Sequence, residues 1–169
     1  VRTMFKPGIH HVTAIAGAPR RNLDFYVGAL GMRFVKKTVN FDDPGTYHFY
    51  YGDETGQPGT ILTFFPWEHA ASGRVGVGET EETAFRIPEA SVGYWTHRLI
   101  EHGAPAERVT RFGETVLVTK DPDGMRIALV AVPGIEGEPG WSDGTVPAEH
   151  AIRGVHTVSL LLADKAKTA

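Results

Sequence analysis

The first apolar stretch of the chain, residues 9–16, has the alternation of side chains that predicts a β-strand. Successive side chains of a strand point to opposite faces, so His11, Thr13 and Ile15 are expected on one face. By the same rule, His10 and His11 are expected on opposite faces, one toward a cavity and the other behind it.

The elements predicted after this strand complete a β-α-β-β-β order. A helix comes next, with Asn22 as its expected N-cap and Gly31 just beyond its end. Turn sequences rich in Asp, Pro and Gly then separate the three strand segments, which are residues 33–40, 46–51 and 60–65.

The same order recurs later in the chain. Ser91 is expected to cap a second helix, and Gly103 stops it 72 residues after Gly31 (103 − 31). The strands around this helix are predicted at residues 83–87, 108–112, 115–119 and 125–132. Because one such module cannot bury its sheet alone, we predict an α+β protein in which tandem βαβββ modules form a curved, barrel-like mixed sheet over a cavity.

These patterns divide the chain into five segments. They are a first module at 1–68, a linker at 69–81, a second module at 82–133, a connector at 134–151 and the first strand of a third module at 152–169. Residues 154–159 echo residues 8–13 at an offset of 146 (154 − 8). This last strand is too apolar to stay exposed and is expected to pair with another strand. A third module that begins here implies a truncated chain or a strand that docks onto another subunit.

Composition narrows the possible functions. The formal net charge is −3, and no concentrated group of Lys and Arg favours nucleic acid. The absence of cysteine excludes thiolate ligands and a Cys nucleophile, so any metal must be held by the eight His or by Asp and Glu. No signal-peptide pattern or membrane-length apolar run is present, which fits a cytoplasmic protein that does not enter a membrane.

His10 and His11 are the first candidates for metal binding, although two ordinary strand histidines are the commoner reading of such a pair. An open non-haem iron site combines two His with one carboxylate. At the matching position in the last strand of each module, the sequence has Thr63 and Ala128, and neither can supply a charged oxygen. Two glutamates, Glu68 and Glu114, lie outside that register and are interpreted as surface residues.

The strand at residues 46–51 has two different faces. Alternation places Tyr47, Phe49 and Tyr51 together, and His48 with Tyr50 on the other side. The pattern is typical of a sheet with one aromatic core face, and it also fits a polar, aromatic cavity wall.

Several motifs resemble a known superfamily. Residues 8–13, with Phe25-Tyr26 and residues 30–32, look like the glyoxalase/bleomycin-resistance/extradiol dioxygenase superfamily, also called the vicinal oxygen chelate or glyoxalase-like fold. A narrower resemblance, to ring-cleaving dioxygenases of the hydroquinone 1,2-dioxygenase type, is carried by residues 35–44, 47–48, 51–53, 63–67 and 147–154. It covers nearly the whole chain, which is similar to the N-terminal half of such enzymes.

This resemblance implies a non-haem dioxygenase that cleaves the ring of hydroquinones, often substituted ones, with Fe(II) or another divalent metal such as Mn(II). It implies that His11 is a metal ligand and that His10 and Thr13 are catalytic residues near the bound aromatic diol and dioxygen. His10 is suited to proton transfer. The other His ligand and the Glu ligand are implied to lie outside this chain, so the isolated chain is expected to be inactive.

Two other functions remain open. A glyoxalase-like isomerase or thiol transferase would need carboxylate or Gln ligands on the final strands, where Thr63 and Ala128 stand. A metal-free module that binds small molecules would need only a cavity with aromatic walls, which Tyr47, Tyr51 and Phe64 could provide. In either case, and for the dioxygenase, the sequence predicts a homo-oligomer or a C-terminal half outside this chain.

Overall fold

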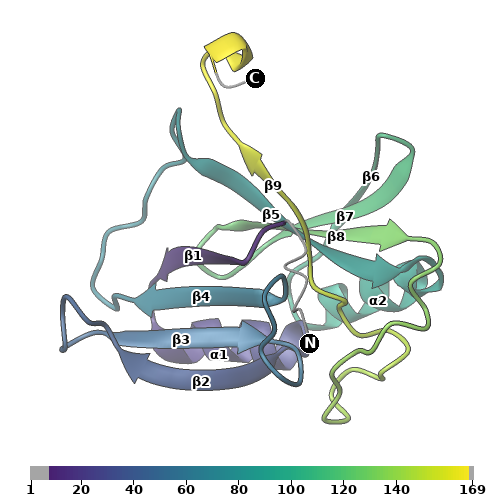
Figure 1. The fold of residues 1–169 in the computed structure, drawn as a ribbon, viewed down its shortest axis with the longest axis horizontal. Helices are drawn as coiled ribbons and strands as arrows, with labels where there is room; N and C mark the ends of the chain where they lie inside the picture. The colour runs from purple at the N-terminus through teal and green to yellow at the C-terminus, as the bar shows by residue number, and fades with distance from the viewer. Residues whose placement is uncertain (1–7, 168–169) are drawn as a thin grey trace, which may run out of the picture.

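The protein is an α+β structure with two curved sheets, each accompanied by one α-helix (Figure 1). The computed structural model describes residues 8–167. The first sheet and its helical segments comprise β1 (His11–Ala16), α1 (Pro19–Leu23), η1 (Asp24–Ala29), β2 (Arg33–Val39), β3 (Tyr47–Gly52) and β4 (Ile61–Pro66). The second comprises β5 (Thr80–Pro88), η2 (Glu89–Ser91), α2 (Val92–Glu101), β6 (Glu107–Arg111), β7 (Glu114–Lys120), β8 (Arg126–Val132) and β9 (Val155–Leu160), followed by the short 3-10 helix η3 (Lys165–Lys167).

The first sheet has the strand order β1-β4-β3-β2. Strand β1 runs parallel to β4, whereas β4 with β3 and β3 with β2 are antiparallel. Helix α1 lies behind this sheet in Figure 1 and covers one of its faces. Along β1 the side chains of His11, Thr13 and Ile15 are exposed, while Val12 and Ala14 pack toward the core, so the predicted alternation is confirmed.

The predicted start of the first helix was wrong. Helix α1 begins at Pro19, and Ala18 rather than Asn22 is its N-cap. Proline is favoured at the first helical position because its ring already fixes the helical φ. Asn22 is buried within the helix, where its Oδ1 accepts a hydrogen bond of 2.7 Å from the Tyr51 hydroxyl. The predicted end is confirmed, because Gly31 follows the C-cap with a φ of 64°.

The second sheet has the strand order β6-β7-β8-β5-β9. Strand β5 is parallel to β8, as β1 is to β4, and its other edge pairs antiparallel with β9. Figure 1 shows β9 running alongside β5. The prediction that the last apolar strand pairs with another strand is therefore confirmed, and the two modules contribute separate sheets instead of one shared sheet.

The second helix is not capped by the side chain of Ser91. A 3-10 turn, η2, precedes α2, and Ser91 at the N-cap position makes no side-chain capping bond. Its hydroxyl instead lies 2.9 Å from Nδ1 of His150 in the long connector. The ring of His150 stacks on Tyr94 with 4.2 Å between centroids, so this end of α2 is held by tertiary contacts that local sequence does not encode.

One apolar core joins the two modules. It contains aromatic and aliphatic side chains from both, including Tyr26, Tyr51, Phe64, Phe85, Trp95 and Leu129. At the junction, the Tyr26 hydroxyl donates a buried hydrogen bond of 2.9 Å to Asp121. The turn after Asp121 also binds the first module, because Asp123 accepts from the Gly17 amide at 2.9 Å and from Arg21 at 2.6 Å.

Candidate active site

The face of the first sheet that points away from α1 carries the candidate residues in register. Thr13 of β1 pairs with Thr63 of β4, Thr63 pairs with Tyr50 of β3, and Tyr50 pairs with Lys36 of β2. These four side chains form a row across the sheet, and His11 lies two residues before Thr13 on the same face. We call this surface the first face.

His10 and His11 lie together, in contrast to the predicted placement on opposite sides of the strand. Both residues are exposed, and their Nδ1 atoms are 3.0 Å apart. The alternation rule does not apply to His10, because β1 begins at His11. His10 is fixed instead through its carbonyl, which accepts a hydrogen bond of 2.7 Å from the Gly59 amide.

The contact between the two rings restricts what each nitrogen can do. In neutral imidazoles one nitrogen carries the proton and the other accepts. If Nδ1 of His11 donates to His10, the lone pair of Nε2 of His11 is free to bind a metal, which is the usual arrangement of a ligating histidine. If the proton lies on His10 instead, Nδ1 of His11 is used as an acceptor.

Thr13 is oriented by the strand beside it. The Thr63 hydroxyl donates a hydrogen bond of 2.9 Å to the Thr13 hydroxyl. Thr63 is buried, whereas Thr13 is exposed on the first face. Because the Thr13 oxygen accepts this bond, its own proton is not used toward Thr63 and is available to a bound molecule.

An aromatic cluster occupies the rest of the first face. His48 stacks on Phe65 with 4.1 Å between centroids, and its Nδ1 lies 2.9 Å from the Tyr50 hydroxyl. The Lys36 ammonium lies 4.6 Å from the centre of the Tyr50 ring. Burial lowers the pKa of His48, and the nearby charges of Lys36 and His11 lower it further. His48 and Tyr50 thus form part of an open polar and aromatic surface.

The aromatic residues named for the metal-free alternative were placed wrongly. Tyr51 and Phe64 are completely buried against the helix side of the sheet, because β3 and β4 turn alternate residues toward α1. Tyr47 is about half exposed but stacks on Phe49 on that same side. None of the three lies on the first face. The strand pattern predicts an aromatic core face with His48 and Tyr50 on the other side, and the burial of Phe49 and Tyr51 confirms it.

The described residues do not make a complete metal centre. Between residues 8 and 167 there is no group of three or more His, Cys, Asp or Glu that could hold an ion. Thr63 and Ala128 occupy the positions where a carboxylate would be needed, and both are buried. Glu68 is exposed beyond β4, and Glu114 lies in the second module, 3.4 Å from His156. His11 and the neighbouring His10 therefore do not make up the three ligands of a facial metal site.

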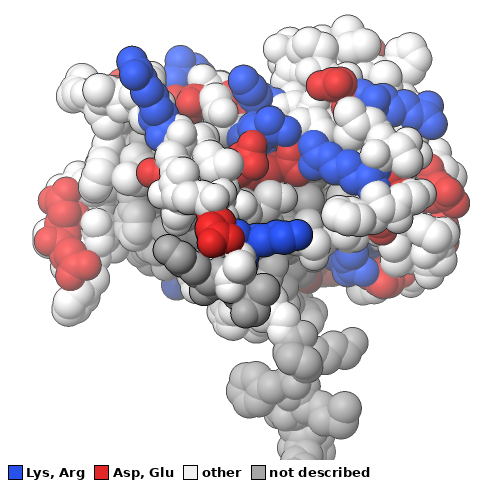
Figure 2. All heavy atoms as spheres, turned by 90° about the horizontal axis from the view of Figure 1, so that it is seen from above, with Lys and Arg blue, Asp and Glu red and all other residues white. Residues whose placement is uncertain are grey.

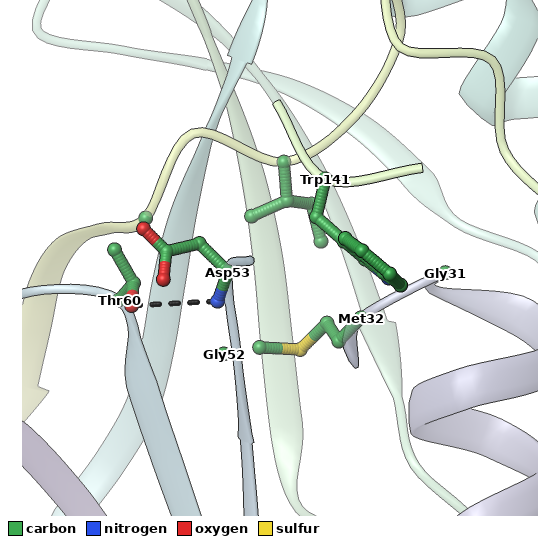
Figure 3. A pocket seen from close by; sticks show the side chains of 8 residues that line it. Gly31, Met32, Gly52, Asp53, Thr60 and Trp141 are labelled. Carbon is green, nitrogen blue, oxygen red and sulfur yellow. Dashed lines mark hydrogen bonds between the residues drawn. The ribbon is translucent and has the colours of Figure 1, made fainter. Parts of the chain in front are cut away.

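An enclosed crevice lies elsewhere, at the junction of the first module and the connector (Figure 3). Met32 and Trp141 face each other across it, and the Asp53 amide is hydrogen-bonded to the Thr60 hydroxyl at 3.5 Å. Its lining includes three glycines and none of the candidate residues on the first face. We interpret it as a packing gap between segments of the chain.

Charged side chains do not form a large patch of one sign on the face shown in Figure 2, where Lys and Arg are interspersed with Asp and Glu. This distribution agrees with the small formal net charge of −3. Among the helices of residues 8–167, none combines the length and the apolar character needed to cross a membrane.

Comparison with known proteins identifies the class. The model of the Glyoxalase/Bleomycin resistance protein/Dioxygenase superfamily matches residues 8–129, and the chain belongs to this superfamily. It is 46% identical to "Putative ring-cleaving dioxygenase MhqO" of Bacillus subtilis (strain 168), over 96% of this chain and 52% of that protein. It is 35% identical to chlorohydroquinone/hydroquinone 1,2-dioxygenase of Sphingobium indicum, over 89% of this chain and 48% of that protein.

A solved structure agrees with the fold. The crystal structure of a "putative dioxygenase" from Bacillus subtilis subsp. subtilis str. 168 matches with a TM-score of 0.90 and 46% identity, covering 95% of this chain and 52% of that one. The α+β architecture predicted from the sequence is therefore confirmed. The chain spans about half the length of the curated relatives it matches.

Proposed function

We propose that this chain is the N-terminal half of a non-haem Fe(II)-dependent dioxygenase that cleaves the aromatic ring of hydroquinones or related phenols. The observation that carries the proposal is the first face, where His11 and Thr13 of β1 are exposed together with His10, the residue just before the strand. The names of the relatives support the class of reaction, and the lengths of those relatives support the assignment as a half.

In this proposal, His11 supplies one metal ligand and the remaining His and Glu ligands come from outside residues 8–167. The geometry of β1 supports this division. In the second sheet, β9 pairs with the edge of β5 that faces away from β8. The equivalent edge of β1 has no partner strand among the described residues. A strand from a complementary half would bring its ligands next to His11 by adding there.

His10 and Thr13 would bind the diol itself. His10 lies beside His11 and is exposed, so its imidazole can accept the proton of a ring hydroxyl. The Thr13 hydroxyl, oriented by Thr63, can donate to an oxygen of the bound molecule. The module bounds at 1–68 and 82–133, with a third module beginning at 152, belong to the same proposal.

A metal-free module that binds small molecules is the second candidate. It is favoured because residues 8–167 contain no group of three ligating side chains, and an aromatic surface without an ion would suffice for binding. A glyoxalase-like isomerase is less favoured, because its metal would need ligands at the positions of Thr63 and Ala128.

Iron content and oxygen uptake distinguish these functions. The chain alone, and the chain supplied with a complementary C-terminal half, would be loaded anaerobically with Fe(II), desalted and assayed with hydroquinone. We expect little retained iron and no oxygen uptake from the chain alone, and both from the complemented protein. Hydroquinone binding without iron in the complemented protein would favour the metal-free module. Full activity of the chain alone would contradict the assignment as a half.

A further inference from the structure

His48 and Tyr50 form a hydrogen-bonded pair that the proposed reaction does not yet use. They lie two residues apart on β3, and their rings are 4.2 Å apart with the Tyr50 hydroxyl 2.9 Å from Nδ1 of His48. Stacking on the Phe65 ring also fixes the plane of the His48 imidazole. The pair therefore has a defined geometry on the first face, with Tyr50 half-buried and not covered.

The second nitrogen of His48 indicates which way the hydrogen bond runs. Nε2 of His48 is shielded from water and has no hydrogen-bond partner. A donor buried without a partner carries the full desolvation cost of its N–H group, and orphaned buried N–H groups are rare in proteins. The favoured tautomer therefore carries its proton on Nδ1, which donates to the Tyr50 oxygen. In that arrangement the Tyr50 hydroxyl proton is free to be donated to another molecule.

The charges around Tyr50 favour an anionic acceptor. The Lys36 ammonium lies 4.6 Å from the Tyr50 ring centre. Strands β1 to β4 contain no Asp or Glu, so no carboxylate on these strands opposes an anion at this position. A hydrogen bond from a hydroxyl to a charged oxygen is stronger than one to a neutral oxygen.

The second module shows that the fold does not require these side chains. Tyr50 pairs with Thr63 on the last strand of the first module, and Val118 pairs with Ala128 on the last strand of the second. Two residues earlier, His48 corresponds in the same way to Val116. The sheet can therefore form with valine at both positions. The presence of histidine and tyrosine in the first module must be explained by something other than the fold.

We propose that Tyr50 binds the oxyanion of an aromatic ring, with His48 as the positioning residue that orients its hydroxyl. The ligand class is a phenolate, lying over Thr63 between β1 and β3, and the inference rests on the proposed function of the first face. Strands are about 4.8 Å apart, so Thr13 and Tyr50 are separated by about 10 Å across the sheet. One ring with an oxygen at each end can lie between them, so Tyr50 would hold the ring oxygen that is remote from His11.

The test is a titration of the 169-residue chain with 4-nitrophenol, followed by amide NMR without metal or oxygen. Measurements on both sides of the ionisation of 4-nitrophenol separate phenol from phenolate. We expect shifts at Thr13, Thr63 and Tyr50 and tighter binding of the phenolate. Tyr50→Phe should weaken phenolate binding about tenfold and phenol binding less, because it removes one charge-assisted hydrogen bond.

Two variants control for structural effects. Tyr47→Phe changes a tyrosine on the opposite side of the same strand and should leave affinity unchanged. His48→Val copies the second module and should reduce the preference for phenolate over phenol while the melting temperature stays close to that of the parent.

A direct reading of the His48 tautomer by long-range 1H–15N correlation completes the test. A proton on Nδ1 supports the proposal, and a proton on Nε2 overturns it. Equal affinity of the parent and Tyr50→Phe, or no binding at millimolar 4-nitrophenol, would also overturn it. Because the titration contains no iron or oxygen, its failure would leave the ring-cleaving proposal to its own assay.

Discussion

Equivalent positions in the two modules carry different side chains on the same framework. Strand pairing defines the equivalence. His11 of β1 pairs with the residue of β4 that lies two positions before Thr63, and Glu82 of β5 pairs with the residue of β8 that lies two positions before Ala128. The first module has His11, Thr13, His48, Tyr50, Thr63 and Phe65 where the second has Glu82, Ala84, Val116, Val118, Ala128 and Val130.

The corresponding face of the second sheet, which we call the second face, is closed by its own residues. Ala84, Val116, Ala128 and Val130 are buried together in a small apolar cluster. The sheet curves enough that Glu114 of β7 comes within 3.4 Å of His156 on β9, across β8 and β5. The first face instead leaves polar side chains exposed. The two modules thus share one framework and carry different side chains on it.

The position equivalent to His11 has a structural role in the second module. Glu82 is only 3% exposed and makes ion pairs with Arg111 at 2.6 Å and Arg126 at 3.2 Å. Glu82→Ala should destabilise the chain by about 2–3 kcal/mol, because it removes the carboxylate shared by two partly buried guanidinium groups and leaves Arg126 only its longer contact of 3.8 Å with Glu81. His11→Ala should change stability by no more than about 0.5 kcal/mol. Urea unfolding of both variants measures this contrast, and equal losses would contradict it.

The junction between the modules should show a smaller, pH-dependent effect. Burial raises the pKa of Asp121, and hydrogen bonds from Met125, Tyr26 and Asp123 oppose that rise. Because its folded pKa is raised, the contribution of Asp121 to the free energy of unfolding is present at low pH and is lost as the pH rises through the folded pKa. The hydrogen bond from Tyr26 favours the ionised carboxylate and offsets part of that loss. Tyr26→Phe should therefore cost about 1–2 kcal/mol at neutral pH and less at acid pH, where Asp121 is protonated.

Chemical unfolding of the parent and Tyr26→Phe at both pH values checks this prediction. Tyr47→Phe serves as the control, because Tyr47 is about half exposed and far from the junction in the strand pairing. A cost for Tyr26→Phe that is larger at low pH would show that the sign is wrong.

The smallest expected effect concerns the electrostatics of the first face. Burial is the main cause of the lowered pKa of His48, and Lys36 and then His11 add to it. Lys36→Met should raise the pKa of His48 part of the way toward its ordinary value, because only one of three causes is removed. Lys37→Met is the matched control, since Lys37 lies over Tyr47 on the other side of the sheet. NMR titration of His48 measures both, and equal shifts would contradict the prediction.

Local patterns predicted the elements well because their causes are local. The alternation along β1 identified the face of His11 and Thr13, and Gly31 marked a helix end that requires a positive φ. The cap at Asn22 was wrong because Pro19 starts the helix earlier, and Asn22 is then used by Tyr51 from a distant strand.

The candidate site was only partly predictable because its arrangement depends on strand pairing. His11 and Thr13 follow from one strand, but the row from Thr13 through Thr63 to Tyr50 exists only because β1 pairs with β4 and β4 with β3. The contact of His10 with His11 depends on where β1 begins, which is two residues later than the alternating pattern of residues 9–16 indicates.

The central claim is that the first face carries the chemistry and the second face carries only structure. It is tested most directly by iron retention and hydroquinone-dependent oxygen uptake in the complemented protein, comparing His11→Ala with His156→Ala. Each change removes a histidine from the first strand of a module. His11 lies on β1 at the first face, and His156 lies on β9 in the second sheet. We predict that His11→Ala abolishes iron retention and oxygen uptake and that His156→Ala leaves both close to the parent. Retained activity in His11→Ala, or equal losses in the two variants, would contradict the account.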